Sequence, residues 1–413
     1  MAVFKPFCAF RPVQDKAKFV ASRPYDVLNS KEARIEAGGN PYSFLHIIKP
    51  EIGLVEGTKP YSDEVYRKGA EVYREFKRNG VLIQDPTPSF YVYRLTMDGR
   101  TQTGIAGCCH FEEYYQGRIK KHELTRVAKE EDRVNHIDAL SANAEPVFFS
   151  YRTNEGIKSV IQQVISESPV YDFIADECIR HELWVLDDPT KVSRLEKLFA
   201  DVSCLYVADG HHRTAAAARV GQKRKDANSK HTGEEEYNLF LAVLFADEEL
   251  KIYDYNRLIK DLHGLTEQEF LSELKSKFSL IEEDKSPVKP CLRGQFSVYL
   301  AHKWYLFAPI ERKVTANPVQ DLDVSFLSDQ VFEPILGISD QRKDERIDFV
   351  GGIRGLEELS RRVDSGEMAV AFALYPVSME ELLQVADAGE IMPPKSTWFE
   401  PKLRSGLFVH ELE

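Results

Sequence analysis

The sequence predicts an α+β, or mixed α/β, architecture. Segments with the apolar pattern of strands and segments with that of helices alternate irregularly, and several neighbouring strands are joined by short turns. A regular doubly wound sheet would alternate strand and helix throughout, which this chain does not do. The length of 413 residues and the hydrophobic content of 43% predict two or three ordinary globular domains.

The N-terminal half contains the clearest helix and the clearest hairpin. The helix is predicted at 62–79, where Ser62 can cap the start and apolar residues recur on one face. The hairpin joins strands at 90–97 and 101–111 through Asp98-Gly99. The other elements expected here are a first strand within 1–16, helices at 126–140, 158–165 and 188–200, and strands at 146–151 and 181–186.

Residues 205–220 predict a buried strand that passes directly into a helix. The strand covers 205–208, Asp209-Gly210 forms the turn, and an alanine-rich helix begins at His211. The next stretch, 222–236, is charged and almost free of apolar side chains, which predicts a surface loop. Beyond it we expect strands at 237–245 and 250–257, a helix at 267–278, a β-rich stretch at 295–310, and mixed helices and strands up to 392.

The order of these elements predicts three domains. They are an N-terminal α/β domain at 1–115, a core domain at 116–260 that carries the Asp-Gly turn, and a C-terminal α/β domain at 261–413. No run rich in Gly, Ser or Pro marks the boundaries.

Charge and composition exclude several classes of function. The net charge of −12 argues against a nucleic-acid binder, because such proteins neutralise many phosphates. No apolar run is long enough to span a membrane, and the N-terminus lacks the apolar segment of a signal peptide. The six cysteines lack metal-binding spacing and are expected to be reduced. We therefore expect a cytoplasmic protein that acts on a small molecule and binds neither nucleic acid nor membrane.

The turn at 209–213, Asp-Gly-His-His-Arg, is the strongest candidate site. The first amides of a helix have no partner within it, and the positive end of the helix dipole attracts anions. His211, His212 and Arg213 add potential cations or donors, and Asp209 adds an acceptor for a hydroxyl or a divalent ion. We predict a phosphate site; the alternative is a capped helix whose side chains bond to the backbone.

A second polar group, Lys-His-Glu-Leu-Thr-Arg at 121–126, precedes a predicted helix. Glu123 could act as a general base on a hydroxyl nucleophile, and His122 could orient it or contact phosphate. Thr125 and Arg126 complete the candidate substrate contacts. The alternative is a solvated helix start capped by Thr125, and the spacing by itself favours that alternative.

Two weaker motifs lie near the ends of the sequence. Near its C-terminal end, two prolines stiffen the backbone before Lys395, Ser396 and Thr397, which could close over a phosphate. A plain surface turn explains the same residues equally well. Arg-Pro-Tyr-Asp-Val at 23–27 predicts a structured turn with its Tyr and Asp directed inward.

No metal site is predicted in the protein itself. Adjacent His211 and His212 do not suit one tetrahedral site, and no cysteine pair accompanies them. Mg²⁺ is expected to arrive with ADP or ATP, because it needs only one or two carboxylates besides phosphate oxygens. Asp209 is the candidate ligand, and no tightly bound metal is expected. The common nucleotide-binding motifs are missing, so a nucleotide would be bound in a less common way.

Several blocks of the chain resemble the bacterial domain-of-unknown-function family 1015. They follow one another over nearly the whole length: RPYDVL, NPYSFLHIIKPE, KKHELT, KEEDR, LYVADGHHRTAAA and MPPKSTWFEPKLRSGL. This resemblance identifies a family without implying an activity.

The Asp-Gly-His-His-Arg turn also resembles that of the ParB–sulfiredoxin fold, whose members bind nucleotide phosphate at a helix N-terminus. The resemblance implies a ParB/sulfiredoxin-like core at 116–260 with additional α/β domains. Within this group the free-serine kinases are most similar, since they carry a His-Glu pair upstream of the same turn. They move a phosphoryl group from ADP or ATP to L-serine with Mg²⁺. Sulfiredoxins need a Cys where this chain has His211, so their chemistry is excluded.

The motifs described above and the resemblance to free-serine kinases together assign expected roles to three sets of residues. The catalytic residues would be Glu123, Asp209 and His212. Phosphate or nucleotide would contact Gly210, His211, Arg213, Lys395, Ser396 and Thr397, and substrate would contact His122, Thr125 and Arg126. Because about eighty residues separate Glu123 from the turn, Glu182 in a second His-Glu pair is a rival base.

The function expected is therefore a phosphotransferase that acts on serine or O-phosphoserine with a nucleotide. Two alternatives remain. One is a phosphoserine phosphatase, which would need no nucleotide. The other is a nucleotide-binding or sensing protein that uses the same turn without turnover.

Overall fold

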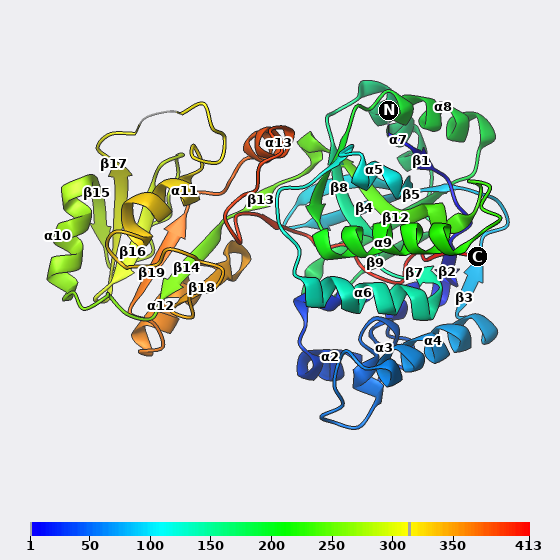
Figure 1. Cartoon of the computed structure of the whole chain (residues 1–413), viewed down its shortest axis with the longest axis horizontal. Helices are drawn as coiled ribbons and strands as arrows, with labels where there is room; N and C mark the ends of the chain where they lie inside the picture. The colour runs from blue at the N-terminus through cyan, green and yellow to red at the C-terminus, as the bar shows by residue number, and fades with distance from the viewer. Residues whose placement is uncertain (1, 313–314) are drawn as a thin grey trace. The chain divides into compact units, whose positions relative to one another are not determined.

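The computed structural model of the chain describes residues 2–312 and 315–413. These residues form two compact units (Figure 1). The first consists of the residues up to Leu250 together with Pro401–Glu413, and the second is Lys251–Glu400. The second unit is thus an insertion in the sequence of the first.

This division differs from the three predicted domains, 1–115, 116–260 and 261–413. Strands from both sides of residue 115 belong to one sheet, since β5 (Arg100–His110) pairs with β12 (Leu239–Ala246). The last residues rejoin the first unit, where the backbones of Phe10 and Val409 exchange hydrogen bonds. The sheet pairing and the return of the last residues both depend on contacts between segments far apart in sequence, so no local change in composition marks them.

The first unit is built on a nine-stranded sheet with the order β6-β11-β8-β12-β5-β4-β10-β9, and β1 pairs with β5. The pairs β6–β11 and β8–β12 are parallel, and the other pairs are antiparallel. This mixed sheet confirms the predicted α+β class. Its other strands are β1 (Phe4–Lys5), β4 (Phe90–Met97), β6 (Ile119–Lys120), β8 (Val147–Tyr151), β9 (Tyr171–Ile174), β10 (Arg180–Leu186) and β11 (Leu205–Asp209).

Helices and two small sheets complete the first unit. Helix α9 lies across the large sheet and α6 packs beside it, with α4 on the far side of α6 (Figure 1). The helices are α1 (Ala17–Val20), α2 (Ser30–Ala37), α3 (Leu45–Ile48), α4 (Asp63–Arg78), α5 (Glu112–Tyr115), α6 (Val127–Leu140), α7 (Glu155–Ile165), α8 (Pro189–Ala200) and α9 (His211–Ala227). The small sheets pair β2 (Phe10–Pro12) with β3 (Leu82–Gln84) and β7 (Ala142–Asn143) with β21 (His410–Glu411).

Most elements of this unit follow the local patterns of the sequence. The hairpin of β4 and β5 turns at Asp98 and Gly99, whose φ values of 51° and 76° are those of a two-residue hairpin turn. Helix α8 begins as predicted, because Asp188 accepts the Lys191 N–H. Helix α4 also forms where expected, but the Ser62 side chain makes no capping bond. Packing of its apolar face therefore stabilises α4 more than its cap does.

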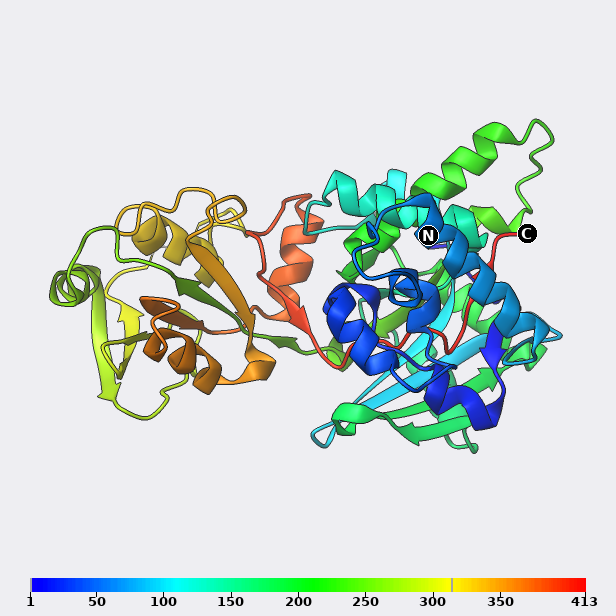
Figure 2. The same ribbon diagram turned by 90° about the horizontal axis from the view of Figure 1, so that it is seen from below.

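The surface loop predicted at 222–236 is wrong for its first part, because α9 continues to Ala227. The stretch is rich in Lys, Arg and Gln, which are good helix formers, and it contains no Gly or Pro between 222 and 227. Ion pairs from Lys223 to Asp138 and from Lys225 to Glu112 fix its exposed face. Figure 2 shows this end of α9, in green, standing out from the rest of the unit.

The second unit has its own sheet and core. Its six strands are antiparallel in the order β15-β17-β16-β19-β14-β18. Helices α10 and α11 pack in one core cluster and α12 packs in another. The elements are β13 (Ile252–Tyr253), β14 (Tyr255–Ile259), α10 (Glu267–Lys277), β15 (Phe278–Asp284), β16 (Phe296–Leu300), β17 (Lys303–Pro309), α11 (Asp323–Leu327), β18 (Ile347–Gly351), α12 (Leu356–Asp364), β19 (Val370–Leu374), α13 (Met379–Asp387) and β20 (Trp398–Phe399).

Two expectations about composition can be compared with the structure. All six cysteines are free thiols, as expected. Among the described residues, every helix is too short or too polar to cross a bilayer.

Candidate functional site

The junction of β11 and α9 forms the centre of the site. Strand β11 ends at Asp209, one residue later than predicted, Gly210 caps the helix, and α9 begins at His211 as predicted. The pairing of β11 with β8 shifts register between Val207 and Asp209, which marks a β-bulge at the end of the strand. Gly210 has φ 90° and ψ 35°, a left-handed conformation that glycine adopts without strain. The chain therefore passes from strand to helix within one residue.

The first turn of α9 combines helix amides with a buried histidine. Thr214 donates its N–H to the Gly210 carbonyl at 2.9 Å, so the amides of residues 211–213 lie before the first helical bond. Nε2 of His211 is buried and has no hydrogen-bond partner. Burial lowers the pKa of this ring to about 4, which keeps it neutral near neutral pH. This ring nitrogen is therefore open to a water molecule or a ligand.

Glu123 and His122 reach this turn from the segment between β6 and α6. Oε2 of Glu123 lies 3.9 Å from Nδ1 of His211, and 41% of the Glu123 side chain is exposed. The His122 ring meets the His211 ring edge-on, with centroids 4.6 Å apart. Burial lowers the pKa of His122 to about 3, and its ring bonds to the backbone of Val207. Glu123 is thus a solvent-accessible carboxylate beside the turn, and His122 is a buried neutral neighbour.

Glu182, the rival base, lies elsewhere in the first unit. It is on β10, and strands β8, β12, β5 and β4 lie between β10 and β11 in the sheet. At about 4.8 Å per strand, this places β10 roughly 24 Å from β11. Glu182 pairs there with Arg94 and Arg180. The geometry therefore favours Glu123 over Glu182.

His212 connects the segment that carries Glu123 to the start of α9. Its Nε2 accepts the N–H of Arg126 at 2.9 Å. This contact requires an unprotonated Nε2, which agrees with a pKa that burial and Lys129 lower. The Thr125 hydroxyl donates to Glu130 at 2.9 Å, and Arg126 rather than Thr125 occupies the cap position of α6. The catalytic role of His212 and the substrate contacts of Thr125 and Arg126 stay predictions.

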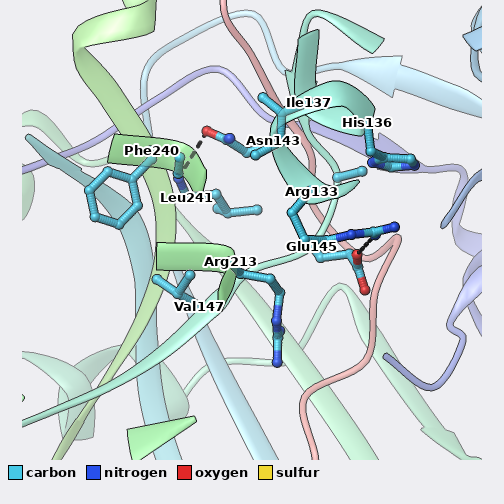
Figure 3. A pocket seen from close by; sticks show the side chains of 11 residues that line it. Arg133, His136, Ile137, Asn143, Glu145, Val147, Arg213, Phe240 and Leu241 are labelled. Atoms are coloured by element: carbon cyan, nitrogen blue, oxygen red, sulfur yellow. Dashed lines mark hydrogen bonds and ion pairs between the residues drawn. The ribbon is translucent and has the colours of Figure 1, made fainter. Parts of the chain in front are cut away.

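Arg213 is buried between two carboxylates. Its Nη2 lies 3.6 Å from Oδ2 of Asp26 and 3.6 Å from Oδ2 of Asp209. Its Nη1 donates to the carbonyl of Pro146, whereas its Nε is buried without a partner. Figure 3 shows the Arg213 side chain leaving α9 beside a small cavity between α6, α9 and β12. The guanidinium thus retains donor capacity at the turn.

A second buried layer supports Arg213 from behind. Arg133 donates to Oε2 of Glu145 at 3.0 Å (Figure 3), and its guanidinium lies 3.8 Å from the centre of the Tyr25 ring. The Tyr25 N–H donates to the other Glu145 oxygen at 3.1 Å. Tyr25 belongs to a short 3₁₀ helix and packs on Arg133, so the turn predicted at 23–27 and its inward tyrosine are confirmed. Asp26, which was also predicted to point inward, is exposed as a residue, although one of its oxygens faces Arg213. This layer holds Asp26 against the site.

Lys402 is a residue of the site that sequence reasoning missed. Its Nζ lies 3.1 Å from Oδ2 of Asp209, and only 16% of its side chain is exposed. Burial acts to raise the pKa of Asp209, but Lys402 and Arg213 outweigh it and hold this pKa well below its usual range. No spacing rule could find a partner so far away in sequence. The one available sign was its position in the block MPPKSTWFEPKLRSGL.

The charges around the turn favour an anion. The cations are Arg213 and Lys402 at Asp209, Lys121 acting on His211, and Arg126 and Lys129 acting on His212. They outnumber the four carboxylates that act on the same residues, which are Asp26, Asp209, Glu123 and Glu145. The helix dipole adds further positive potential at the same point.

Lys395, Ser396 and Thr397 belong to the second unit. The Ser396 hydroxyl donates to the Pro393 carbonyl at 2.7 Å, which closes a local turn. Lys395 has φ 57°, and its ammonium lies 5.6 Å from the centre of the Tyr255 ring. These contacts explain the local structure, and the role of the three residues in phosphate binding stays a prediction.

The carboxylates at the turn partly fit the needs of Mg²⁺. Asp26 and Asp209 approach the same Arg213 nitrogen, so the two side chains lie close together. Two carboxylates suffice for Mg²⁺ when phosphate oxygens supply the other ligands. In the described part of the chain no group of three or more His, Cys, Asp or Glu is arranged to hold a metal ion. A divalent cation would therefore need the ligand's own oxygens.

A comparison with protein families identifies the chain. The model of the family described as protein of unknown function (DUF1015) matches residues 4–325, which is well over half of the sequence. The chain belongs to this family. The resemblance inferred from its sequence blocks is thereby confirmed, and the matched residues include the whole 121–126 and 209–213 segments. No curated protein matches the chain.

Several solved structures are similar to this chain. A conserved hypothetical protein from Pyrococcus furiosus is 16% identical, with a TM-score of 0.34, over 70% of this chain and 91% of its own. A free serine kinase in complex with AMP is 14% identical, with a TM-score of 0.33, over 70% and 88%. SbnI with a C-terminal truncation from Staphylococcus aureus is 11% identical, with a TM-score of 0.38, over 73% and 85%. These scores are low, so the function has to be inferred from the chemistry of the site.

Proposed function

We propose that this DUF1015 protein is a phosphotransferase that moves a phosphoryl group between a nucleotide and the hydroxyl of a small molecule. The observation that carries the proposal is the meeting of anion-binding groups with an accessible carboxylate at the start of α9. Oε2 of Glu123 lies 3.9 Å from Nδ1 of His211, in the turn that also holds Arg213 and Lys402. The proposed acceptor is serine, and the proposed product is O-phosphoserine, because the turn resembles that of free-serine kinases.

The start of α9 supplies the phosphate site of this proposal. Phosphoryl transfer needs positioning and charge stabilisation more than covalent chemistry from the protein. The amides of residues 211–213 and the buried Arg213 guanidinium would contact the phosphate oxygens. The ring of His211 is neutral and buried, so its unpartnered Nε2 can serve the ligand without adding charge.

Glu123 has the properties of a general base. Its carboxylate is partly exposed and lies next to the turn, so a bound hydroxyl could reach it. In the transfer, the substrate oxygen forms a bond to phosphorus, the bond from phosphorus to the bridging oxygen of the nucleotide breaks, and Glu123 takes the hydroxyl proton. His212 holds the segment that carries Glu123 through the Arg126 N–H.

Asp209 and Asp26 are the residues that would hold Mg²⁺ together with the phosphates of ADP or ATP. Mg²⁺ supplies charge neutralisation on the transferred phosphoryl group when it is bound. Arg213 lies between the two carboxylates and would shift toward the phosphate oxygens as these enter.

The proposal is tested by assaying the purified protein with serine, Mg²⁺ and either ADP or ATP, and with O-phosphoserine alone. We expect nucleotide-dependent interconversion of serine and O-phosphoserine, followed by ³¹P NMR. Glu123→Gln should lower the turnover by about 10²- to 10⁴-fold, the usual contribution of a general base. Glu248→Gln is the matched control, since Glu248 is 45% exposed and pairs with Lys158 on the surface.

Three results would contradict the proposal. Release of phosphate from O-phosphoserine without nucleotide would indicate a phosphatase. Tight nucleotide binding without any product would indicate a sensing or binding protein. Wild-type turnover in both Glu123→Gln and Asp209→Asn would show that the turn is structural.

A further inference from the structure

Lys402 belongs to the site because its ammonium contacts a residue that is far away in sequence. The lysine follows the second unit by two residues, yet its ammonium pairs with Asp209 of β11. The backbone on both sides of it is anchored in the first unit. Gln102 of β5 donates to the Pro401 carbonyl at 3.4 Å, and the Arg404 N–H lies 3.5 Å from the Tyr93 hydroxyl of β4. The segment is therefore built to hold Lys402 at this point.

We propose that Lys402 is a phosphate-binding residue of the site and that it moves from Asp209 to the phosphate when the ligand enters. This inference rests on the proposed function, and it assigns to that function a residue, a ligand class and an order of binding. The ligand class is a nucleoside diphosphate or triphosphate, or the phosphate group of a phosphorylated small molecule.

Lys402 and Arg213 compete for one oxygen atom of Asp209. Oδ2 of Asp209 lies 3.1 Å from Nζ of Lys402 and 3.6 Å from Nη2 of Arg213. Two cations thus meet at a single carboxylate oxygen, directly before the amides that begin α9. A phosphate carries more negative charge than a carboxylate and offers three oxygens, so it can contact both cations at once. The lysine side chain is flexible enough to follow it.

Burial also makes the ion pair between Lys402 and Asp209 costly. A partly buried lysine–aspartate pair gains little stability, because desolvation and solvent screening offset most of the attraction between the charges. The pair is therefore a weak reason for the fold to keep Lys402 at this position. A ligand that needs the ammonium gives a stronger reason, and the buried Nε of Arg213, which has no hydrogen-bond partner, is a second donor that an anion at this point could use.

The move of Lys402 from Asp209 to the phosphate also changes how the site can bind a divalent cation. While Lys402 and Arg213 hold Asp209, its oxygen is a poor metal ligand, and no metal-binding cluster is formed in the described residues. When both cations turn to the phosphate, Asp209 becomes available to the cation that accompanies it. We therefore expect a divalent cation to bind tightly only together with a phosphate-containing ligand.

The experiment measures ligand affinity rather than turnover. ADP and inorganic phosphate are titrated by calorimetry into the full-length protein and into Lys402→Met and Lys402→Arg. Loss of one charge-assisted contact should weaken binding of both probes by about 10- to 100-fold in Lys402→Met, and Lys402→Arg should stay within a few-fold of the wild type. The matched control is Lys77→Met, because Lys77 is another partly buried lysine paired with a carboxylate, Glu411, away from the turn.

A second measurement separates phosphate binding from mere positioning. Mn²⁺ binding is followed by electron paramagnetic resonance with and without ADP. The wild type should bind Mn²⁺ tightly only with ADP. Lys402→Met should bind free Mn²⁺ more strongly than the wild type does, although tight binding still needs ADP, because Asp209 has lost one competing cation and keeps Arg213. A structural role for Lys402 would not produce this gain.

The outcomes distinguish this inference from the proposed function. Wild-type ADP affinity and unchanged Mn²⁺ behaviour in Lys402→Met would overturn the role of Lys402, even if the enzyme phosphorylates serine. Weaker ADP binding in Lys402→Met with no turnover in any variant would support Lys402 as a phosphate ligand and contradict the phosphotransferase.

Discussion

Gly210 is the residue on which the shape of the turn at 209–213 depends. Its φ of 90° is unfavourable for any residue with a Cβ, and a Cβ built here would lie 3.1 Å from the Arg213 guanidinium. Replacement of Gly210 by alanine would therefore strain the backbone and would also displace the Arg213 side chain.

We predict that Gly210→Ala lowers the free energy of unfolding by about 1–2 kcal/mol, the cost of a left-handed non-glycine residue, and also weakens ADP binding. Urea unfolding and calorimetry measure the two effects. Gly117→Ala is the matched control, because Gly117 has φ 71° with no atom within 4 Å of a built Cβ. Gly117→Ala should lose similar stability and keep its ADP affinity; equal affinities in both variants would refute the link between Gly210 and Arg213.

Sequence reasoning at the residue scale succeeded where the site is local. Asp209, Gly210, His211 and Arg213 are consecutive or nearly so, and a strand followed by a glycine and a helix fixes their geometry. Lys402 could not be found in this way, because its place depends on the path of the whole chain. Asp26 was singled out only as part of a turn, and its contact with Arg213 required the fold.

At the scale of elements, the segment between β6 and α6 decides where Glu123 lies. One end of this segment is attached to α9 by the bond from the Arg126 N–H to Nε2 of His212. Protonation of Nε2 removes the acceptor. Because burial and Lys129 lower the pKa of His212 below its ordinary value, the contact is present at neutral pH and is lost as the pH falls through that lowered pKa.

We predict that His212→Ala increases hydrogen exchange at the Arg126 amide and lowers turnover, while the protein stays folded. Hydrogen exchange with mass spectrometry and the serine assay measure the two effects. His110→Ala removes a similar bond, in which ring Nδ1 accepts the Glu112 N–H at 3.3 Å, away from Glu123. If both variants reduced turnover equally, the segment would not act through His212.

Helix and strand positions were predictable where the pattern is local, as in the hairpin of β4 and β5 and in α8. The end of α9 was not, because the charged residues after Gly221 look like a loop by composition. Their helical state depends on Lys223 and Lys225, whose partners Asp138 and Glu112 come from distant segments. The predicted ParB/sulfiredoxin-like character of this core stays a prediction.

For the whole molecule, buried histidines set the response to acid. Burial lowers the pKa of His122, His136 and His181 to about 3 and that of His211 to about 4. The unfolded chain binds protons at these rings near pH 6.5, whereas the folded chain does not until the pH is far lower. Between these values the unfolded state binds more protons, so stability falls as the pH falls.

We predict that the free energy of unfolding of the first unit is nearly constant above pH 6.5. It should decrease by roughly 1 kcal/mol per buried histidine for each pH unit below that value. Urea unfolding at pH 7.5, 6.5 and 5.5 measures this. His302→Ala is the control, since this side chain is 80% exposed and should leave the slope unchanged. A stability that rises toward pH 5.5 would contradict the assignment.

The division into units could not be read from the sequence. The chain leaves the first unit after Leu250 and returns at Pro401 without a linker rich in Gly, Ser or Pro. A second sheet with its own apolar core is encoded in the intervening residues. Contacts between segments far apart in sequence, such as the pairing of β21 with β7 and the backbone bonds between Phe10 and Val409, reveal that the first unit is discontinuous.

That discontinuity affects the protein while it is being synthesised. The strand and helix around Asp209 leave the ribosome long before Lys402 exists, and β21 is added later still. A nascent chain that stops at residue 400 would present Asp209 without its ammonium partner and β7 without its neighbour. Competence to hold a nucleotide would therefore appear late in translation, after the inserted unit has emerged.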